Sequence, residues 1–204
     1  MSEAELSTEL VILEAAKKVF VQRGFAGARM QEIADEAGIN KALLHYYYRS
    51  KEKLFQKVFE DTVGGIMQQF NQVITAQGSV LEKLDQIIAT YIRNIRKNPH
   101  LPLFVLHELS QNRLEFLQYF KNNAAGMPNI ALLIQQLFEE QEAGSIRTYQ
   151  PLHLFLNVIS MCVFPFIAKP VFCNIMDLSE AEFNAIMEER ITEVQTFVRR
   201  ALEP

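Results

Sequence analysis

Apolar residues recur every three or four positions along nearly the whole chain, and strict alternation of apolar and polar residues persists nowhere. A period of about 3.6 residues is typical of amphipathic helices, whereas half-buried strands alternate with a period of two. The sequence therefore predicts an all-α fold. It contains no internal repeat, low-complexity tract or long linker, so we expect helices joined by short turns.

Capping residues and helix breakers divide this pattern into segments of ordinary helix length. Ser7 or Thr8 is the predicted cap of a first helix, which Gly24 ends. Pro165 and Pro170 should bend a long apolar helix near the carboxyl end, because proline lacks an amide N–H. Outside the motif described next, helices are predicted at about residues 8–24, 51–76, 79–97, 101–110, 114–125, 129–142, 151–174 and 179–201.

One short segment combines a helix, a glycine turn, a second helix and a basic cap, between Ile33 and Leu54. Ile33 and Ala37 lie on one apolar helical face, and Gly38 provides the left-handed backbone position at which a helix ends in a sharp turn. Asn40 offers a side-chain oxygen that can cap the next helix. This spacing is typical of a helix-turn-helix that reads DNA.

The residues of this segment resemble the DNA-binding domain of the TetR family of bacterial one-component repressors. That family follows roughly G-(Y/F)-x-x-T-(T/S)-x-x-x-I-A and then A-G-V-S-x-G-(T/S)-(L/I)-Y-x-(Y/H)-F-x-(S/N)-K-x-x-L. The chain has GFAGARMQEIA and AGINKALLHYYYRSKEKL at the matching places. The resemblance covers the first quarter of the chain and implies a helix-turn-helix DNA-binding domain of three helices at residues 1–50. A helical effector-binding and dimerisation domain would follow at residues 51–204.

Four positions depart from the family pattern. Ala28 stands where a threonine usually caps the second helix, and Ala42 replaces a glycine. Leu43 replaces a hydroxyl residue, and His45 replaces the usual tyrosine. These departures concern the operator sequence and local phosphate contacts, and they leave the predicted fold unchanged.

Charge is unevenly distributed along the chain, whose formal net charge is -4. Residues 17–57 contain nine Lys or Arg and four Asp or Glu, a local charge of +5, so the remainder carries -9. A basic segment that coincides with the motif favours contact with phosphates at one end of the protein. The net acidity argues against a protein that coats nucleic acid without sequence preference.

The second motif helix carries the residues expected to read bases. Lys41, Ala42 and His45 share one face, on which Lys41 can donate to guanine or phosphate and His45 can bond a base edge. Tyr47 can contact a DNA sugar or a thymine methyl group; the alternative is that it packs inside the small domain. Tyr48 occupies the position at which the family has a buried aromatic residue. By resemblance, Gln31, Lys41, Ala42, Leu43, His45 and Tyr47 face DNA, and Lys51 with Arg29 holds backbone phosphates.

The body of the chain is rich in Phe and Met, in the region where TetR-like proteins keep an effector pocket. Such side chains suit an apolar, roughly planar ligand, and they suit ordinary core packing equally well. His107 lies in an apolar stretch, where a histidine is more often an interior residue with its hydrogen bonds satisfied. The alternative is that His107 makes a polar contact to an effector. The candidate pocket residues are Phe104, His107, Gln111, Phe116, Tyr119, Phe120, Met127, Phe138 and Met161.

The last two long helices have more apolar positions than one buried face requires, which predicts a homodimer through a four-helix bundle. The candidate interface residues are Phe164, Phe183, Met187, Val194 and Val198, some of which must cover their own subunit. The resemblance implies that an effector moves the fourth helix and separates the two recognition helices. We therefore expect a repressor whose partners are a double-stranded DNA operator, a second copy and a small-molecule effector.

Other classes fit the sequence less well. His107 and Glu108 are adjacent on a helix and do not face each other, and the chain lacks HExxH, GxSxG, CxxC and a phosphate-binding glycine loop. An enzyme is therefore not expected. The alternative is a helical protein-interaction module without sequence-specific DNA binding.

The cysteines and the amino-terminal segment indicate a cytoplasmic protein. Cys162 and Cys173 have no partner at metal-ligand spacing, so we predict buried free thiols, no metal and no cofactor. The amino terminus does not read as a secretory signal. The longest apolar run, residues 154–168, is shorter than the ~20 residues that span a bilayer, so no membrane partner is expected.

Overall fold

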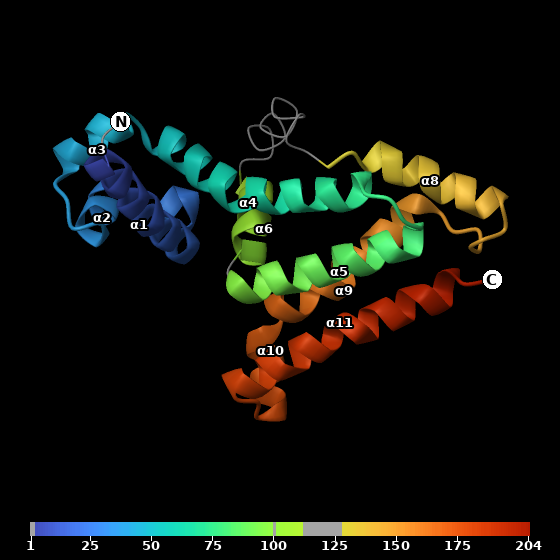
Figure 1. Cartoon of the computed structure of the whole chain (residues 1–204). Helices are drawn as coiled ribbons and strands as arrows, with labels where there is room; N and C mark the ends of the chain where they lie inside the picture. The colour runs from blue at the N-terminus through green and yellow to red at the C-terminus, as the bar shows by residue number, and fades with distance from the viewer. Residues whose placement is uncertain (1–2, 100, 112–127) are drawn as a thin grey trace. The chain divides into compact units, whose positions relative to one another are not determined.

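The computed structural model describes residues 3–99, 101–111 and 128–204, and in these ranges the chain forms helices and turns without strands (Figure 1). The predicted all-α fold is confirmed. The predicted helix at residues 114–125 lies outside the described residues. The helices are α1 (Glu3–Gly27), α2 (Met30–Glu36), α3 (Lys41–Tyr47), α4 (Lys51–Thr75), α5 (Val80–Lys97), α6 (Leu101–Gln111), α8 (Ile130–Glu142), α9 (Pro151–Ile167), α10 (Lys169–Met176) and α11 (Glu180–Leu202).

The chain divides into two compact units. The first comprises Met1–Gly65 with Leu103–Ala124, and the second comprises Ile66–Pro102 with Ala125–Pro204. Helix α4 begins in the first unit and ends in the second. This long helix is therefore the continuous element that belongs to both units.

In the first unit, α1 lies against α2, and α2 lies against α3. The inner face of α1 is fully buried at Ile12, Ala16 and Phe20. The helix begins at Glu3, so the prediction that Ser7 or Thr8 caps it is wrong. The preceding Glu, Ala and Leu residues favour helix and extend it past the expected start. The predicted break at Gly24 is confirmed by its left-handed φ of 67°.

The core of the second unit is formed mainly by α5, α9 and α11. Ile88 and Ile92 of α5 are fully buried and meet buried residues of both other helices. Cys162 of α9 is also fully buried, as predicted, and burial raises the pKa of its thiol to about 12. Cys173 is half-buried, so the prediction of a buried thiol holds only for Cys162.

The long apolar helix predicted at residues 151–174 is two helices, α9 and α10, bent by 60° relative to each other. Pro165 lies inside α9, and the break falls at Ala168. Pro170 lies in the first turn of α10. Backbone N–H groups of the first turn make no hydrogen bond within the helix, so the N–H that proline lacks costs nothing there. No single helix within the described ranges is long and apolar enough to cross a membrane. The bent α9–α10 pair, taken together, would be long and apolar enough by length and composition alone.

The carboxyl end of α4 is fixed by a buried lysine. Lys83 is only 6% exposed, and its ammonium donates to the carbonyl of Ile74 at 2.8 Å and to Oε1 of Gln136 at 2.7 Å. The amide of Gln136 in turn donates to the carbonyl of Gly78 and to the Glu140 carboxylate, both at 2.8 Å. A buried ammonium without such partners would cost several kcal/mol, so these bonds hold the α4–α5 turn against α8.

Candidate DNA-binding site

The turn between α2 and α3 has the geometry predicted from its glycine. Gly38 has a φ of 67°, and the N–H of Ile39 donates to the carbonyl of Ala34 at 3.0 Å, which ends α2 in a Schellman motif. A Cβ at position 38 would meet no atom within 4 Å, so backbone conformation and not space selects glycine here. The side chain of Asn40 accepts the N–H of Leu43 at 2.8 Å and caps α3 as predicted.

Helix α3 is anchored by residues on its inner side. Leu44 is fully buried, and so are Ile33 and Ala34 of the predicted apolar face of α2. Tyr48, which ends the helix, is buried as predicted, and its hydroxyl donates to Glu9 of α1 at 2.9 Å. Burial, reinforced by this hydrogen bond and by the charge of Glu9, raises the pKa of Tyr48 well above its ordinary value. These contacts fix the orientation of α3 about its own axis.

The outer side of α3 is open to solvent. Lys41, Ala42 and His45 are exposed, and so is Leu43, whereas Tyr47 is half-buried. Of these residues, Lys41, Ala42 and His45 lie within one accessible face of α3. Their contacts with bases remain predictions.

Two further predicted DNA contacts lie at the start of α2. Arg29 and Gln31 are exposed. The amide of Gln31 donates to Asp35 one turn later at 2.8 Å, which restricts its side chain to one side of the helix. The backbone N–H of Arg29 donates to Glu32 at 3.2 Å and starts α2 in place of the family's threonine cap.

The sequence prediction omitted two exposed residues of this region. Tyr46 is 74% exposed, and its ring lies edge-on to that of Tyr47 with the centroids 5.5 Å apart. Arg49, just after α3, is exposed as well. A helical wheel would have found Tyr46, because it lies about 200° around the helix from the inward Leu44.

Lys51 has partners that the sequence did not predict. The residue was expected to hold a phosphate, yet its ammonium donates to the carbonyls of Phe25 at 2.8 Å and Ala28 at 3.1 Å. Lys51 is half-buried. Its charge therefore lies against the corner between α1 and α2.

The predicted effector pocket is only partly described. Phe116, Tyr119, Phe120 and Met127 lie outside the described residues, as do the side chains of Phe104, His107 and Gln111. Of the remaining two, Phe138 is 49% exposed and Met161 is half-buried. The pocket assignment therefore stays a prediction.

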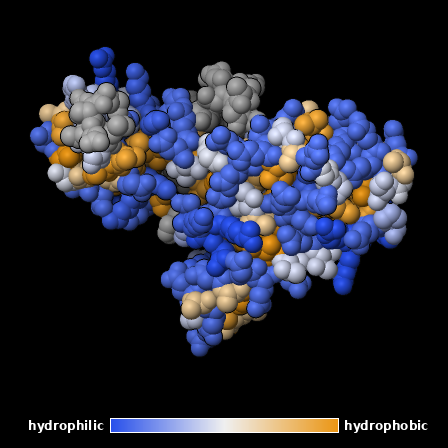
Figure 2. All heavy atoms as spheres, viewed as in Figure 1, coloured by the Kyte–Doolittle hydropathy of each residue, from blue (hydrophilic) through white to orange (hydrophobic). Residues whose placement is uncertain are grey.

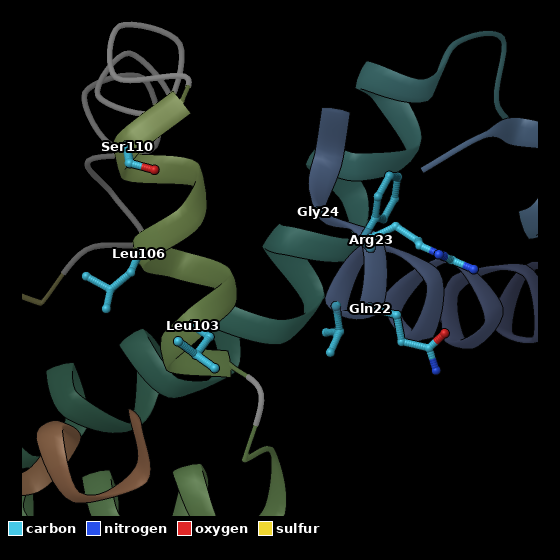
Figure 3. A pocket seen from close by; sticks show the side chains of 8 residues that line it. Gln22, Arg23, Gly24, Leu103, Leu106 and Ser110 are labelled. Carbon is cyan, nitrogen blue, oxygen red and sulfur yellow. The ribbon is translucent and has the colours of Figure 1, made fainter. Parts of the chain in front are cut away.

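A cavity of about 490 Å³ lies elsewhere, in the first unit between α1 and α6. In Figure 3 the side chains of Gln22 and Arg23 extend away from α6, and Leu106 extends away from α1. The side chains of Gln22 and Arg23 thus do not point into this space. The described residues that line it are Phe20, Val21, Gln22, Arg23, Gly24, Leu103, Leu106 and Ser110. Phe138 and Met161, the two predicted pocket residues whose side chains are described, are not among them.

The predicted dimer interface needs a correction. Phe183, Met187, Val194 and Val198 are at most 4% exposed, because α11 turns this face to the core shared with α5 and α9. Their assignment to an interface between subunits is wrong. Phe164, the fifth predicted residue, is 58% exposed.

Other apolar side chains of the same helices are open to solvent. In α9 they are Leu152, Leu156 and Ile159, which share a face opposite the buried residues, and α11 exposes Ile186 and Phe197. The lower lobe in Figure 2, which contains α10, also displays apolar residues. The exposed apolar residues of α10 are Val171, Ile175 and Met176.

A capped glycine turn followed by a short helix with an exposed outer face is the geometry of a helix-turn-helix that reads DNA. The model of the family described as "Bacterial regulatory proteins, tetR family" matches residues 12–58, which span α2, α3 and parts of α1 and α4. Residues 12–58 are therefore a DNA-binding segment of the TetR type, and the chain is a DNA-binding transcriptional regulator.

Similar proteins are regulators too. The fatty acid metabolism regulator protein of Bacillus subtilis (strain 168) is 25% identical over 136 residues, which cover 67% of this chain and 69% of that protein. The HTH-type transcriptional repressor NicS of Pseudomonas putida is 46% identical over 61 residues, or 30% of this chain and 27% of that protein.

The fold is also shared with a solved structure. The crystal structure of the transcriptional regulator FadR from Bacillus subtilis in complex with stearoyl-CoA superposes with a TM-score of 0.64. The match covers 91% of this chain and 96% of that chain at 18% identity. The likeness extends the shared fold beyond the DNA-binding segment to the helical body.

Proposed function

We propose that this regulator is a homodimeric repressor that binds a roughly palindromic operator and leaves it when a small apolar effector binds. Residues 1–50 read DNA, and residues 51–204 bind the effector and form the dimer. The observation that carries the proposal is the exposed face of Lys41, Ala42 and His45 on a helix that the buried Leu44 and Tyr48 anchor. A two-fold dimer presents this face twice, which requires two related half-sites.

The predicted DNA-binding residues of α2 and α3 have distinct roles in this proposal. Lys41 donates to guanine or phosphate, and His45 bonds a base edge. Tyr47 contacts a sugar or a thymine methyl through the part of its ring that is exposed. Gln31, oriented by Asp35, faces the neighbouring bases, and Arg29 holds a backbone phosphate. Ala42 and Leu43 supply the apolar part of the face.

Selection of bound duplexes from random DNA should enrich one pair of inverted half-sites. His45→Ala should relax the base preference at one position of each half-site by about 1 to 3 kcal/mol, because a base-edge contact discriminates by about this amount. The control is His153→Ala, which removes an exposed histidine of α9. Absence of any enriched half-site would contradict the proposed function, and an unchanged preference in the variant would contradict the role of His45.

The effector is proposed to be an acyl compound. The chain's relative is named for fatty acid metabolism, and a regulator of the same fold holds stearoyl-CoA. The aromatic and Met side chains predicted to line the pocket, including Phe138 and Met161, suit an apolar chain. An acyl ligand that favours the state with low operator affinity would shift the population toward release.

Stearoyl-CoA should bind and lower operator affinity, and saturating operator should weaken stearoyl-CoA binding by the same factor. Linkage requires this symmetry, because one coupling free energy acts on both sites. Calorimetric titration with and without the selected duplex measures both sides, and coenzyme A without an acyl chain is the control. Equal stearoyl-CoA affinities in the two titrations would show that this compound is not the inducer.

The dimer is proposed to form through the exposed apolar residues of α9 and α11. Leu152, Leu156 and Ile159 form a stripe on α9, and Phe197 of α11 is 61% exposed. Exposed apolar stripes of this kind mark interaction surfaces in soluble proteins. A second copy would cover both helices in an isologous interface, in which the same patch of each subunit meets its equivalent.

A further inference from the structure

Helix α4 contains two adjacent glycines, Gly64 and Gly65, near its middle. Both lie within continuous α-helix, and neither has a positive φ. A Cβ built at either position would meet no atom of the described residues within 4 Å. Alanine would therefore fit at both positions, so neither backbone conformation nor contact with the described residues selects glycine here.

The glycine pair loosens the helix at this point. In a helix interior, glycine is less favourable than alanine by a free energy equivalent to a factor of about five. Two glycines in succession thus raise the population of locally open helix about twenty-five-fold relative to two alanines. Glycine pairs are also among the few recognised causes of sharp bends in helices.

The pair lies where α4 passes from one compact unit to the other. Gly65 is the last residue of the first segment of the first unit, and Ile66 is the first residue of the second unit. The amino half of α4 is held within the first unit, where the ring of Phe55 packs edge-on against that of Phe20 in α1, with the centroids 5.1 Å apart.

The carboxyl half of α4 is held within the second unit by polar contacts. The N–H of Asn129, the cap residue of α8, donates to Oδ1 of Asn71 at 3.0 Å. The side-chain amide of Asn94 in α5 donates to Oε1 of Gln69, also at 3.0 Å. These bonds add to the tie that Lys83 makes at the end of the helix. Each half of α4 is thus fastened to its own unit, and the two glycines lie between the fastened halves.

We propose that Gly64 and Gly65 form a joint in α4 that lets each DNA-binding unit of the dimer adjust its direction, so that the protein tolerates operators with more than one half-site spacing. The inference rests on the proposed function, because it presumes a dimer on two half-sites. One added base pair moves a half-site by about 3.4 Å along the DNA and by about 35° around it. Stiff α4 helices would require the DNA to deform instead, which costs free energy.

Hydrogen exchange in the free protein tests the joint without operator or effector. The amides of residues 66–69 bond to the carbonyls of residues 62–65 in the helix, and they should exchange faster than the amides of the flanking turns. Gly64→Ala combined with Gly65→Ala should slow this segment about twenty-five-fold. The double variant should fold, because both Cβ atoms have room. An unchanged exchange rate in this segment would overturn the proposal.

Operator spacing tests the consequence of the joint. Affinity is measured for the selected duplex and for the same duplex with one base pair added between the half-sites. On the longer duplex, the double alanine variant should lose at least about tenfold more affinity than the unaltered protein loses. Equal losses in the two proteins would overturn the proposal.

The matched control for the spacing measurement is Gln72→Gly. It places a glycine on the exposed side of α4 within the second unit, away from the boundary. Its helix is weakened by a comparable amount, yet it should show the spacing tolerance of the unaltered protein. If no duplex is enriched, the proposed function fails and with it the role in spacing, while the exchange rates still decide whether the joint exists.

Discussion

Replacing Leu156 and Phe197 together by glutamate should give a folded monomer that has lost its operator affinity. Both side chains are more than half exposed in the single chain, at 51% and 61%, so charges there do not disturb the core. In a dimer they would bury four carboxylates against apolar surface, which strongly disfavours association. A monomer reads one half-site, and we expect operator affinity to fall on the order of a thousandfold, toward nonspecific binding.

Light scattering gives the mass of the variant, circular dichroism its helix content, and fluorescence anisotropy its operator affinity. The control replaces Ile130 and Leu132 of α8 by glutamate, because these residues are also exposed but lie outside α9 and α11. The control should remain a dimer. A double variant of Leu156 and Phe197 that stays dimeric would place the interface on another surface, of which α10 is the next apolar candidate.

Val194→Asp should unfold the protein and should not produce a soluble monomer. Val194 is 1% exposed in the core between α5, α9 and α11. A carboxylate at this position would lie among buried apolar side chains and should cost more than about 4 kcal/mol, a large part of the stability of a typical domain. Soluble yield and thermal unfolding followed by circular dichroism measure the effect.

Glu193→Asp is the control for this change, because its side chain is exposed on the same turn of α11. It should leave yield and melting temperature close to those of the unaltered protein. A Val194→Asp protein that is well folded and monomeric would restore the original assignment of Val194 to the subunit interface. The two charge variants thus separate the buried face of α11 from its exposed face.

The DNA-binding motif could be predicted from the sequence because its geometry depends on neighbours in the chain. Gly38 ends α2 through its own backbone conformation, and Asn40 caps α3 through a bond to a residue three positions later. Ser179 and Glu182 form the predicted capping box of α11 in the same way. Such bonds span at most one helical turn, so residue type and spacing determine them.

The sequence could not predict which faces of α9 and α11 are buried in the core of their own subunit. Both helices carry apolar residues on more than one face, and hydrophobicity alone does not distinguish a core from a subunit interface. Packing against α5 decides that Val194 is buried and that Phe197 is exposed. The sequence predicted bends at Pro165 and Pro170 but not a break at Ala168 between them, because a proline inside a helix is tolerated or not according to its surroundings.

Periodicity and turn chemistry by themselves determined the helical class, most helix ends and the exposed reading face of α3, since each follows from residues a few positions apart. Only the tertiary structure decided the partners of Lys51, because Phe25 and Ala28 lie 26 and 23 positions away from it in sequence. An exposed lysine and a buried one look alike in a sequence. The difference arises when folding brings two backbone carbonyls and an aromatic ring to the same ammonium.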